Sequence, residues 1–339
     1  MNLLAPISAV GWVTGVFGAE KSFVANPIIG NAKLNEWGLH RARVKTAERM
    51  ARLRRGMMTG VSDADKAAYN RDGVVIKENY LPDDVFKRVR DEVFDQPLPA
   101  REMRQGQTVT RMIPLSHANR TLLPEATTAA WDKGLNRLTG YVAGRTGAPI
   151  HFIQTVIAEP SRKKADPQTA LHADTFHSTS KFWLFLHDVD VEDGPFIFAP
   201  GSHKLTPQRL AWEYEQSLTA RAEKRAHHSY GSFRINADQM EALGYQPPRQ
   251  VAVPANTLVV ADTYGFHSRS PSSKPTIRTE LHGHLRRNPF APWNGLDLQG
   301  LPGINHWQLE INNWWLAKTG QKNIWRDVGM VRANAEAEV

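Results

Sequence analysis

Three side chains in this sequence have types and spacings that suit a single metal ion. His172 and Asp174 are separated by one residue, so on an extended strand both side chains point to the same face. A third candidate ligand, His267, follows Asp174 after 93 residues. If the fold brings the three together, two imidazoles and one carboxylate can bind one ion and leave coordination positions open.

This combination is the ligand set of non-haem Fe(II) oxygenases. The H-x-D tripeptide alone is weak evidence, because structural histidines beside aspartates are commoner than metal ligands. Two further features support the site. The residues from Asp193 to His203 predict a short hairpin directly after the metal-binding strand, and Arg278 lies eleven residues after His267 in a predicted strand.

Several short strands are needed to bring these residues to one end of a sheet. Alternating hydrophobic residues bounded by turn residues predict strands at 74–76, 108–113, 151–159, 250–253, 257–261 and 276–285. Helices before and between them indicate a mainly β fold with helices (α+β), a double-stranded β-helix or jelly roll. No G-x-G-x-x-G motif follows a predicted strand, so nucleotide-binding folds have no support.

We expect two parts in the chain: an extension over 1–60 and a jelly-roll domain over 61–339. The extension has an apolar, turn-rich segment, 1–30, and a basic helix over roughly 34–55. The apolar stripe of that helix is formed by Val44, Ala47, Met50 and Ala51. A basic amphipathic helix suits contact with an anionic membrane, while a helix packed on the domain is the alternative.

Other helices are expected inside the domain. A first helix is expected directly after Ser62, which has the position of a helix cap. A second begins near Pro82, with Val85, Val89 and Val93 as its buried stripe, and a third spans 124–143. A helical insertion covers 204–250, where Leu210, Tyr214 and Leu218 are in register. A tryptophan-rich tail, 288–339, is expected to pack on the barrel or line its mouth.

Composition limits the classes of function. The chain of 339 residues has no cysteine, which excludes disulfides, thiolate metal sites, iron–sulfur clusters and cysteine nucleophiles. Its formal charge of +8 favours an anionic partner, such as an acidic membrane or an anionic substrate. The first nineteen residues carry no charge and are interrupted by three glycines and a proline, so we expect neither a signal peptide nor a membrane span. A cytoplasmic location is expected, with peripheral membrane contact left open.

The joint pattern resembles one known family. H-x-D, then a tryptophan-containing strand, then D-G-P…P-G-S-H-K is similar to the phytanoyl-CoA dioxygenase family of Fe(II)/2-oxoglutarate oxygenases. The spacing from His267 to Arg278 matches this family, as does the segment that begins at Asp72-Gly73 and runs to Asp84. The resemblance covers roughly residues 65–287.

This resemblance implies an iron enzyme with 2-oxoglutarate and O2 as co-substrates. His172, Asp174 and His267 would bind Fe(II). Arg278 would bind the distal carboxylate of 2-oxoglutarate, for which a guanidinium is suited. The remaining residues implied around the co-substrate are Trp183, Gln154 and Ser268. Two residues after His267, where the family often has a hydroxyl, this chain has Arg269.

The same resemblance constrains the reaction. Halogenating relatives have a small residue in place of the carboxylate, so Asp174 implies hydroxylation or a related oxidation such as desaturation. The substrate is expected to be a small or lipid-linked, amphiphilic and anionic molecule. A catalytically silent binding protein for an anionic ligand or membrane is the alternative. A nucleic-acid demethylase is disfavoured, because no second arginine follows Arg278 at the spacing those enzymes use, and we expect no nucleic-acid partner.

Four residues are candidates for substrate contact. Phe176 and His177 follow the ligands directly and would approach the mouth of the site, with simple packing as the alternative. Arg111 would reach an anionic group, with a salt-bridged structural role as the alternative, and Arg269 is the fourth candidate. Glu280, His282 and His284 share strand parity with Arg278, so all four are expected to face one side.

Overall fold

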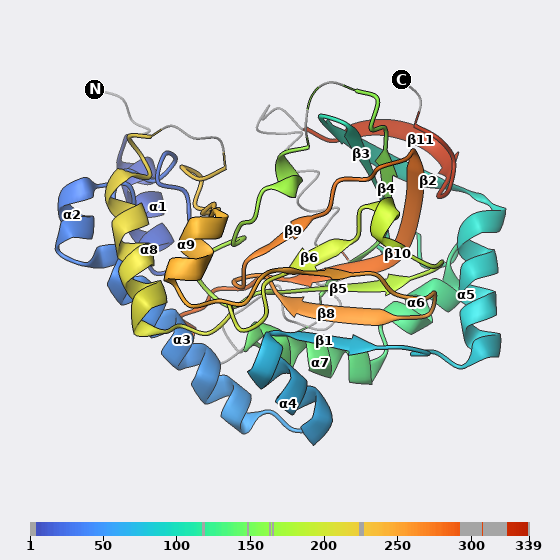
Figure 1. Ribbon diagram of the computed structural model, residues 1–339, viewed down its shortest axis with the longest axis horizontal. Coiled ribbons are helices and arrows are strands. Elements are labelled where there is room, and N and C mark those ends of the chain that lie inside the picture. Colours follow the sequence, from blue (N-terminus) through green and yellow to red (C-terminus); the bar gives the residue numbers. More distant parts are fainter. Residues whose placement is uncertain are drawn as a thin grey trace.

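Two antiparallel sheets form the centre of the protein (Figure 1). The computed structural model describes residues 5–116, 119–147, 149–162, 164, 166–223, 227–291, 307 and 324–337. The larger sheet has the strand order β1 (Val74–Lys77), β8 (Leu258–Asp262), β5 (Ser180–Phe185), β10 (Thr276–Leu285), β4 (Ile150–Ala158), β3 (Thr108–Pro114), β2 (Pro97–Gln105) and β11 (Arg326–Arg332). The smaller sheet consists of β7 (Arg249–Val251), β6 (Phe196–Phe198) and β9 (His267–Arg269). This architecture confirms the predicted jelly roll with helices.

The two sheets pack against each other through apolar side chains. Trp183 on β5 contacts Phe196 on β6, with ring centroids 4.6 Å apart. Phe185, Val259 and Phe198 belong to the same buried cluster. Each such side chain contributes about 1.5–3 kcal/mol when it is fully removed from water, so this layer holds the small sheet over the large one.

Strand β10 lies in the middle of the large sheet, between β5 and β4. Its ten residues pair with β4 over Thr276–His284 and with β5 over Glu280–Leu285. The strand therefore carries Arg278 and Glu280 into the interior between the sheets, as their common parity predicted.

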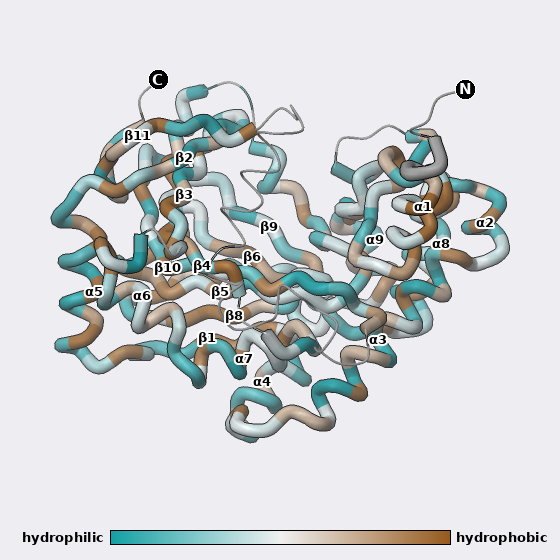
Figure 2. Tube along the Cα trace, turned by 180° about the vertical axis from the view of Figure 1, so that it is seen from behind, coloured by the Kyte–Doolittle hydropathy of each residue, from teal (hydrophilic) through white to brown (hydrophobic). Residues whose placement is uncertain are grey.

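Helices cover the outer face of the large sheet. They are α4 (Asp63–Asp72), α5 (Asp83–Asp95), α6 (Pro124–Ala130) and α7 (Lys133–Ala143). Ser62 caps α4 through its hydroxyl, and Val89 and Val93 of α5 are fully buried, as predicted. In Figure 2 the tube of α5 alternates between hydrophobic and hydrophilic residues, as expected for a helix with one buried face.

A second group of helices lies at one end of the sheets, on the left in Figure 1. It contains α1 (Ala5–Val16), α2 (Ala32–Glu36), α3 (Leu39–Met57), α8 (Pro207–Thr219) and α9 (Ala237–Ala242). The N-terminal segment and the 204–250 insertion thus form one helical layer, although residues 61–203 lie between them in the sequence. Among the described residues, no helix is long and apolar enough to cross a membrane.

Several expected elements differ from the structure. Residues 5–16 form a helix where we expected turns. The helix expected over 34–55 is divided at Gly38, whose φ of 97° breaks the helical path, and the helix over 124–143 is divided where Asp132 caps α7. Strand β2 was missed, because Pro97 and Pro99 interrupt the β pattern.

Two helical faces differ in part from the expectation. On α3, Val44, Ala47 and Ala51 of the expected stripe are buried, but Arg43 and Arg54 of this basic helix are buried as well. On α8, the buried residues include Arg209 and Glu213, which form an ion pair, rather than Leu210, Tyr214 and Leu218. Charged residues that pair internally are invisible to an analysis of hydrophobic periodicity. Most of the tail, over 292–306 and 308–323, lies outside the described residues.

Candidate metal centre and adjoining cavities

The two candidate histidines are held side by side by their own backbones. His172 donates its N–H to the carbonyl of His267 at 3.0 Å, and His267 donates to the carbonyl of His172 at 2.9 Å. This two-residue bridge places the imidazole ring centroids 4.5 Å apart. His172 and Asp174 were expected on a regular strand but do not lie on one. The pair of backbone bonds with His267 holds His172, and one backbone bond to the carbonyl of Thr263 holds Asp174.

Asp174 completes a compact cluster. Its Oδ1 lies 3.6 Å from Nε2 of His172 and 3.6 Å from Nε2 of His267. One potential ligand atom from each residue lies within 4.8 Å of the others, and no other such group of three was found among the described residues. His267 therefore converges with His172 and Asp174, although 93 residues of sequence separate it from Asp174, as predicted.

The hydrogen bonds of the two histidines leave the correct nitrogen for a metal. Nδ1 of His172 lies 2.8 Å from the Ala170 carbonyl, and Nδ1 of His267 lies 2.9 Å from the Gly265 carbonyl. Since a carbonyl only accepts, Nδ1 carries the proton in both rings and Nε2 presents a lone pair to the cluster. Nε2 of His267 is buried and has no hydrogen-bond partner among the described residues.

The charge states of the cluster also fit a divalent cation. Burial, together with the neighbouring His267, lowers the pKa of His172 to about 4, so the ring is neutral at neutral pH. Burial alone would raise the pKa of Asp174, but Lys181 and the two histidines hold it well below its usual range. Two imidazoles and one carboxylate fit a 2-His-1-carboxylate iron site.

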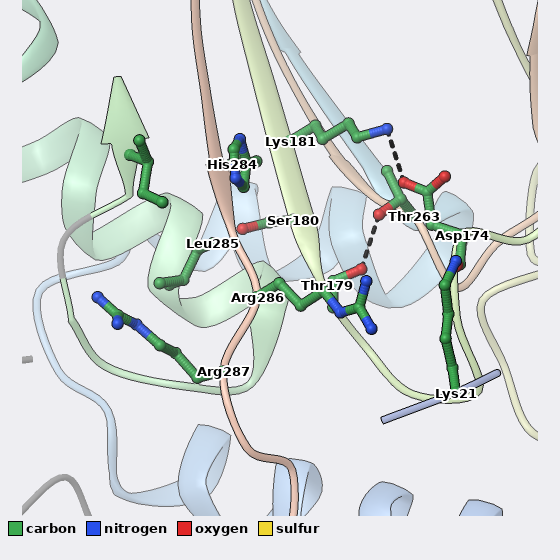
Figure 3. Close-up of a pocket in the computed structure, with 11 residues that line it drawn as sticks. Lys21, Asp174, Thr179, Ser180, Lys181, Thr263, His284, Leu285, Arg286 and Arg287 are labelled. Atoms are coloured by element: carbon green, nitrogen blue, oxygen red, sulfur yellow. Dashed lines mark hydrogen bonds and ion pairs between the residues drawn. The ribbon is translucent and has the colours of Figure 1, made fainter. Parts of the chain in front are cut away.

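Lys181 on β5 holds the other oxygen of Asp174. Its Nζ lies 2.6 Å from Oδ2 of Asp174, as Figure 3 shows. Asp174 therefore presents Oδ1 to the histidines and Oδ2 to a lysine. Lys181 lies two residues before Trp183, so both side chains point to the same face of β5. This spacing is the signal by which Lys181 could have been identified from the sequence.

An inner cavity of about 110 Å³ begins at the two histidines and runs between the sheets. Its lining includes the five residues expected around the co-substrate or beside it, namely Gln154, Trp183, Ser268, Arg269 and Arg278. Oε1 of Gln154, Nε of Arg278 and both carboxylate oxygens of Glu280 are buried there without a hydrogen-bond partner among the described residues. Since buried polar groups are normally paired, this cavity is suited to a polar ligand.

Arg278 and Glu280 form the polar end of this inner cavity. Nη1 of Arg278 donates to the Gly194 carbonyl, and its Nε lies 3.7 Å from Oε2 of Glu280. Burial raises the pKa of Glu280 to about 7, although Arg278 and Arg269 oppose the shift. Arg269 is held by Asp166, whose Oδ2 accepts a bond of 2.8 Å.

Three residues expected to contact substrate lie elsewhere. Arg111 is 1% exposed, pairs with Glu102 at 2.6 Å and donates to C-terminal backbone carbonyls, so the prediction that it reaches an anionic ligand is wrong. The ring of Phe176 packs against the guanidinium of Arg43, whose Cζ lies 4.1 Å from the ring centroid. His177 is buried and bonded to the Ser178 carbonyl. Phe176 and His177 therefore pack in the interior, which was the alternative to substrate contact.

Asp174 lines a second, outer cavity of about 440 Å³ (Figure 3). It is lined by Lys21, Ile150, Asp174, Thr179, Ser180, Lys181, Thr263, His284, Leu285, Arg286 and Arg287. Sequence reasoning missed its basic residues. Lys21 has no local signal in the sequence, because only the tertiary fold brings the N-terminal segment to the metal cluster.

One family model matches the sequence of this chain. The family model described as phytanoyl-CoA dioxygenase matches residues 69–242, about half of the chain. No curated protein matches the chain.

Several solved structures have a similar fold. The epimerase SnoN, solved with Fe3+, alpha ketoglutarate and nogalamycin RO, is 19% identical, with 71% of this chain and 90% of that chain covered and a TM-score of 0.46. HygX from Streptomyces hygroscopicus, with nickel, 2-oxoglutarate and hygromycin B, is 12% identical, covering 66% and 86% with a TM-score of 0.41. AviO1 from Streptomyces viridochromogenes is 15% identical, covering 67% and 97% with a TM-score of 0.40.

Proposed function

Because this chain belongs to the phytanoyl-CoA dioxygenase family of Fe(II)- and 2-oxoglutarate-dependent oxygenases, we propose that it hydroxylates an unactivated C–H bond of a small anionic molecule, with release of succinate and CO2. The cluster of His172, Asp174 and His267 is the observation that carries the proposal. Its two free Nε2 atoms and its ionised carboxylate converge where a cation can be bound. When bound, Fe(II) with 2-oxoglutarate and O2 supplies the oxidising power that breaks the C–H bond.

The protein's part is to hold the reactants. His172, Asp174 and His267 bind the metal on one face. The hydrogen bonds from Nδ1 to backbone carbonyls orient the two rings, and the ion pair with Lys181 orients the carboxylate. The carboxylate at Asp174 completes the ligand set, which favours hydroxylation or desaturation over halogenation.

We place 2-oxoglutarate in the inner cavity. The guanidinium of Arg278 binds the distal carboxylate, because it is the buried cation at the far end from the histidines. Gln154 and Ser268 line the same cavity with polar side-chain atoms, and Trp183 forms an apolar wall that keeps water out. The neutral form of Glu280 can donate a hydrogen bond to an anion, whereas its ionised form would repel one.

The organic substrate belongs in the outer cavity. Asp174 lines this cavity while the two histidines line the inner one, so the metal cluster lies between the two spaces. A volume of about 440 Å³ suits a small molecule.

Contact with an anionic membrane remains a second element of the proposal. Three apolar side chains of the N-terminal segment are exposed: Val10 by 64%, Val13 by 50% and Phe17 by 68%. Neighbouring apolar side chains are seldom all exposed in this way unless they contact a partner or a membrane. We expect the full chain to sediment with anionic vesicles more than with zwitterionic ones. Equal sedimentation with the two vesicle types would contradict this part of the proposal.

The metal site is tested by optical titration without oxygen. Anaerobic addition of Fe(II) and 2-oxoglutarate should give a weak visible charge-transfer band, and His172→Ala should abolish both this band and succinate formation. His227→Ala is the matched control, because His227 lines neither the inner nor the outer cavity. A folded wild-type protein without the band would contradict the proposed iron site.

A further inference from the structure

The outer cavity contains an excess of positive charge. Four of its lining residues are cationic, namely Lys21, Lys181, Arg286 and Arg287, and Asp174 is the single carboxylate among them. These cations come from separate parts of the chain. Lys21 follows α1, Lys181 lies on β5, and Arg286 directly follows β10. An excess of cations gathered from distant segments is costly unless an anion accompanies it.

We propose that Lys21, Lys181 and Arg286 bind the anionic group of the substrate, a carboxylate or a phosphate, so that the N-terminal segment forms part of the active site. This inference rests on the proposed function and names the part of the substrate that the cavity recognises. Lys21 and Arg286 act as specificity-determining residues, while Lys181 also holds Asp174.

The single carboxylate of this cavity cannot neutralise the cations. Oδ1 of Asp174 faces the two histidines, and its Oδ2 is taken by Lys181. Lys21 donates from Nζ to the backbone carbonyl of Asp174, and Arg286 donates to the backbone carbonyl of Ala19 at 2.8 Å. Neither forms an ion pair with a carboxylate in the part of the chain that the structure describes.

One further acidic residue, Glu20, acts on both Lys21 and Arg286. Its Oε1, however, accepts hydrogen bonds from the backbone N–H groups of Lys21 and Ser22, at 2.8 and 2.6 Å. Glu20 therefore stabilises the bend of the chain that presents Lys21, and it leaves the ammonium group of Lys21 available for a ligand.

The neutral lining of the cavity defines the rest of the ligand. Ser180 is 1% exposed, and its hydroxyl has no hydrogen-bond partner among the described residues, so it can donate to an anionic oxygen. Ile150 and Leu285 provide apolar walls. The cavity is thus suited to a small organic anion that carries an aliphatic portion, with its charge beside Lys21 and its aliphatic portion against Ile150 and Leu285.

The position of Lys21 is fixed by the α3 helix. The guanidinium of Arg43 on α3 donates to the carbonyls of Val16, Gly18 and Glu20, at 2.9, 3.2 and 2.6 Å. After Lys21, Phe23 donates its backbone N–H to Ser229 in the helical insertion. Lys21 is therefore anchored on both sides, as a residue of a binding site must be.

Binding of simple probes tests the inference. Hexanoate, hexyl phosphate and hexan-1-ol share one apolar chain and differ in the head group. Calorimetric titration of the full-length protein, loaded with Fe(II) and 2-oxoglutarate without oxygen, should show at least one anion binding about tenfold more tightly than the alcohol. The tighter of the two anions identifies the head group. Equal affinity for all three probes would overturn the inference.

Substitutions assign the effect to the named residues. Lys21→Met and Arg286→Met should each weaken binding of the preferred anion about tenfold and leave hexan-1-ol unchanged, since they remove charge and keep length. Lys21→Arg should retain anion binding. Lys45→Met, on the exposed face of α3, is the control with the same change in net charge. Equal losses in Lys21→Met and Lys21→Arg would overturn the inference, because charge would not be the cause.

The two proposals fail separately in this design. A protein that forms the Fe(II)–2-oxoglutarate band but does not prefer anions would retain the proposed function and lose the anion site. A folded protein that prefers anions but gives no band would retain the anion site and lose the iron chemistry.

Discussion

Glu280 is the one acidic group inside the cavity that we assign to 2-oxoglutarate. It is fully buried on β10, opposite Gln154 of β4 and Phe185 of β5. The charged groups that act on it are Arg278 on the same strand and Arg269 on β9. An ionised carboxylate at this place would compete with the co-substrate for Arg278, whereas a neutral one can donate to it.

We therefore expect the affinity for 2-oxoglutarate to depend on pH. Burial raises the pKa of Glu280 from 4.5 to about 7, so below pH 7 the group is neutral, and above it the group becomes charged. Affinity should fall as pH rises, by up to about fivefold between pH 7 and 8. Titration of the charge-transfer band at pH 6, 7 and 8 measures this dependence.

Glu280→Gln is the matched variant for this prediction. It preserves shape and hydrogen bonding and removes the titration, so its affinity for 2-oxoglutarate should vary less with pH than that of the wild type.

The raised pKa of Glu280 also means that the folded state holds a proton that the unfolded state loses above pH 4.5. Stability of the unliganded protein should therefore fall as pH rises through 7. If affinity and stability depend on pH in Glu280→Gln as strongly as in the wild type, another group is responsible for both effects.

At the scale of elements, helix α8 supports the loop that precedes His267. Arg209 of α8 is fully buried, pairs with Glu213 at 3.1 Å, and donates to the carbonyls of Ser202 and Tyr264. Glu213 also receives a bond of 2.9 Å from His40 on α3. The insertion is thus joined to both the N-terminal helices and the backbone that precedes His267.

Breaking this buried pair should weaken the fold. Glu213→Ala leaves the Arg209 guanidinium buried without its carboxylate, so we expect the free energy of unfolding to fall by about 3–5 kcal/mol. Urea denaturation followed by circular dichroism measures the change. Glu215→Ala, at an exposed position of the same helix, should change it by less than about 0.5 kcal/mol. Similar losses in the two variants would contradict a specific role for the pair.

The same helix shows what sequence can and cannot predict. Thr206 and Pro207 have the local chemistry of a helix start, so the beginning of α8 was predicted correctly. Its buried face was not, because Arg209 and Glu213 are hidden by pairing with each other rather than by being apolar. The metal cluster was predictable from residue types and family resemblance, whereas Lys21 was not, since its position depends on bonds from Arg43 across the tertiary structure.

At the scale of the whole molecule, the N-terminal segment shares its core with the rest. Phe23 and Ile29 belong to one buried cluster with Trp212 and Phe266, and Val44 packs in another with Phe176 and Tyr264. Arg54 donates to the carbonyls of Gly144, Pro289 and Ala291. The division into 1–60 and 61–339 remains a prediction about independent folding, and these contacts favour a single cooperative unit.

Removal of residues 1–60 tests that cooperativity. Exposing the partners of Phe23, Ile29 and Val44 removes about 1.5–3 kcal/mol for each side chain, so the thermal midpoint should fall by more than about 10 °C. Lys21→Met in the full chain is the control, because it removes the cavity charge and keeps the core, and its midpoint should stay near that of the wild type. If the truncated chain instead unfolds at the wild-type temperature, the extension is an independent part, and its contacts with α8 and Phe266 contribute nothing to the stability of the protein.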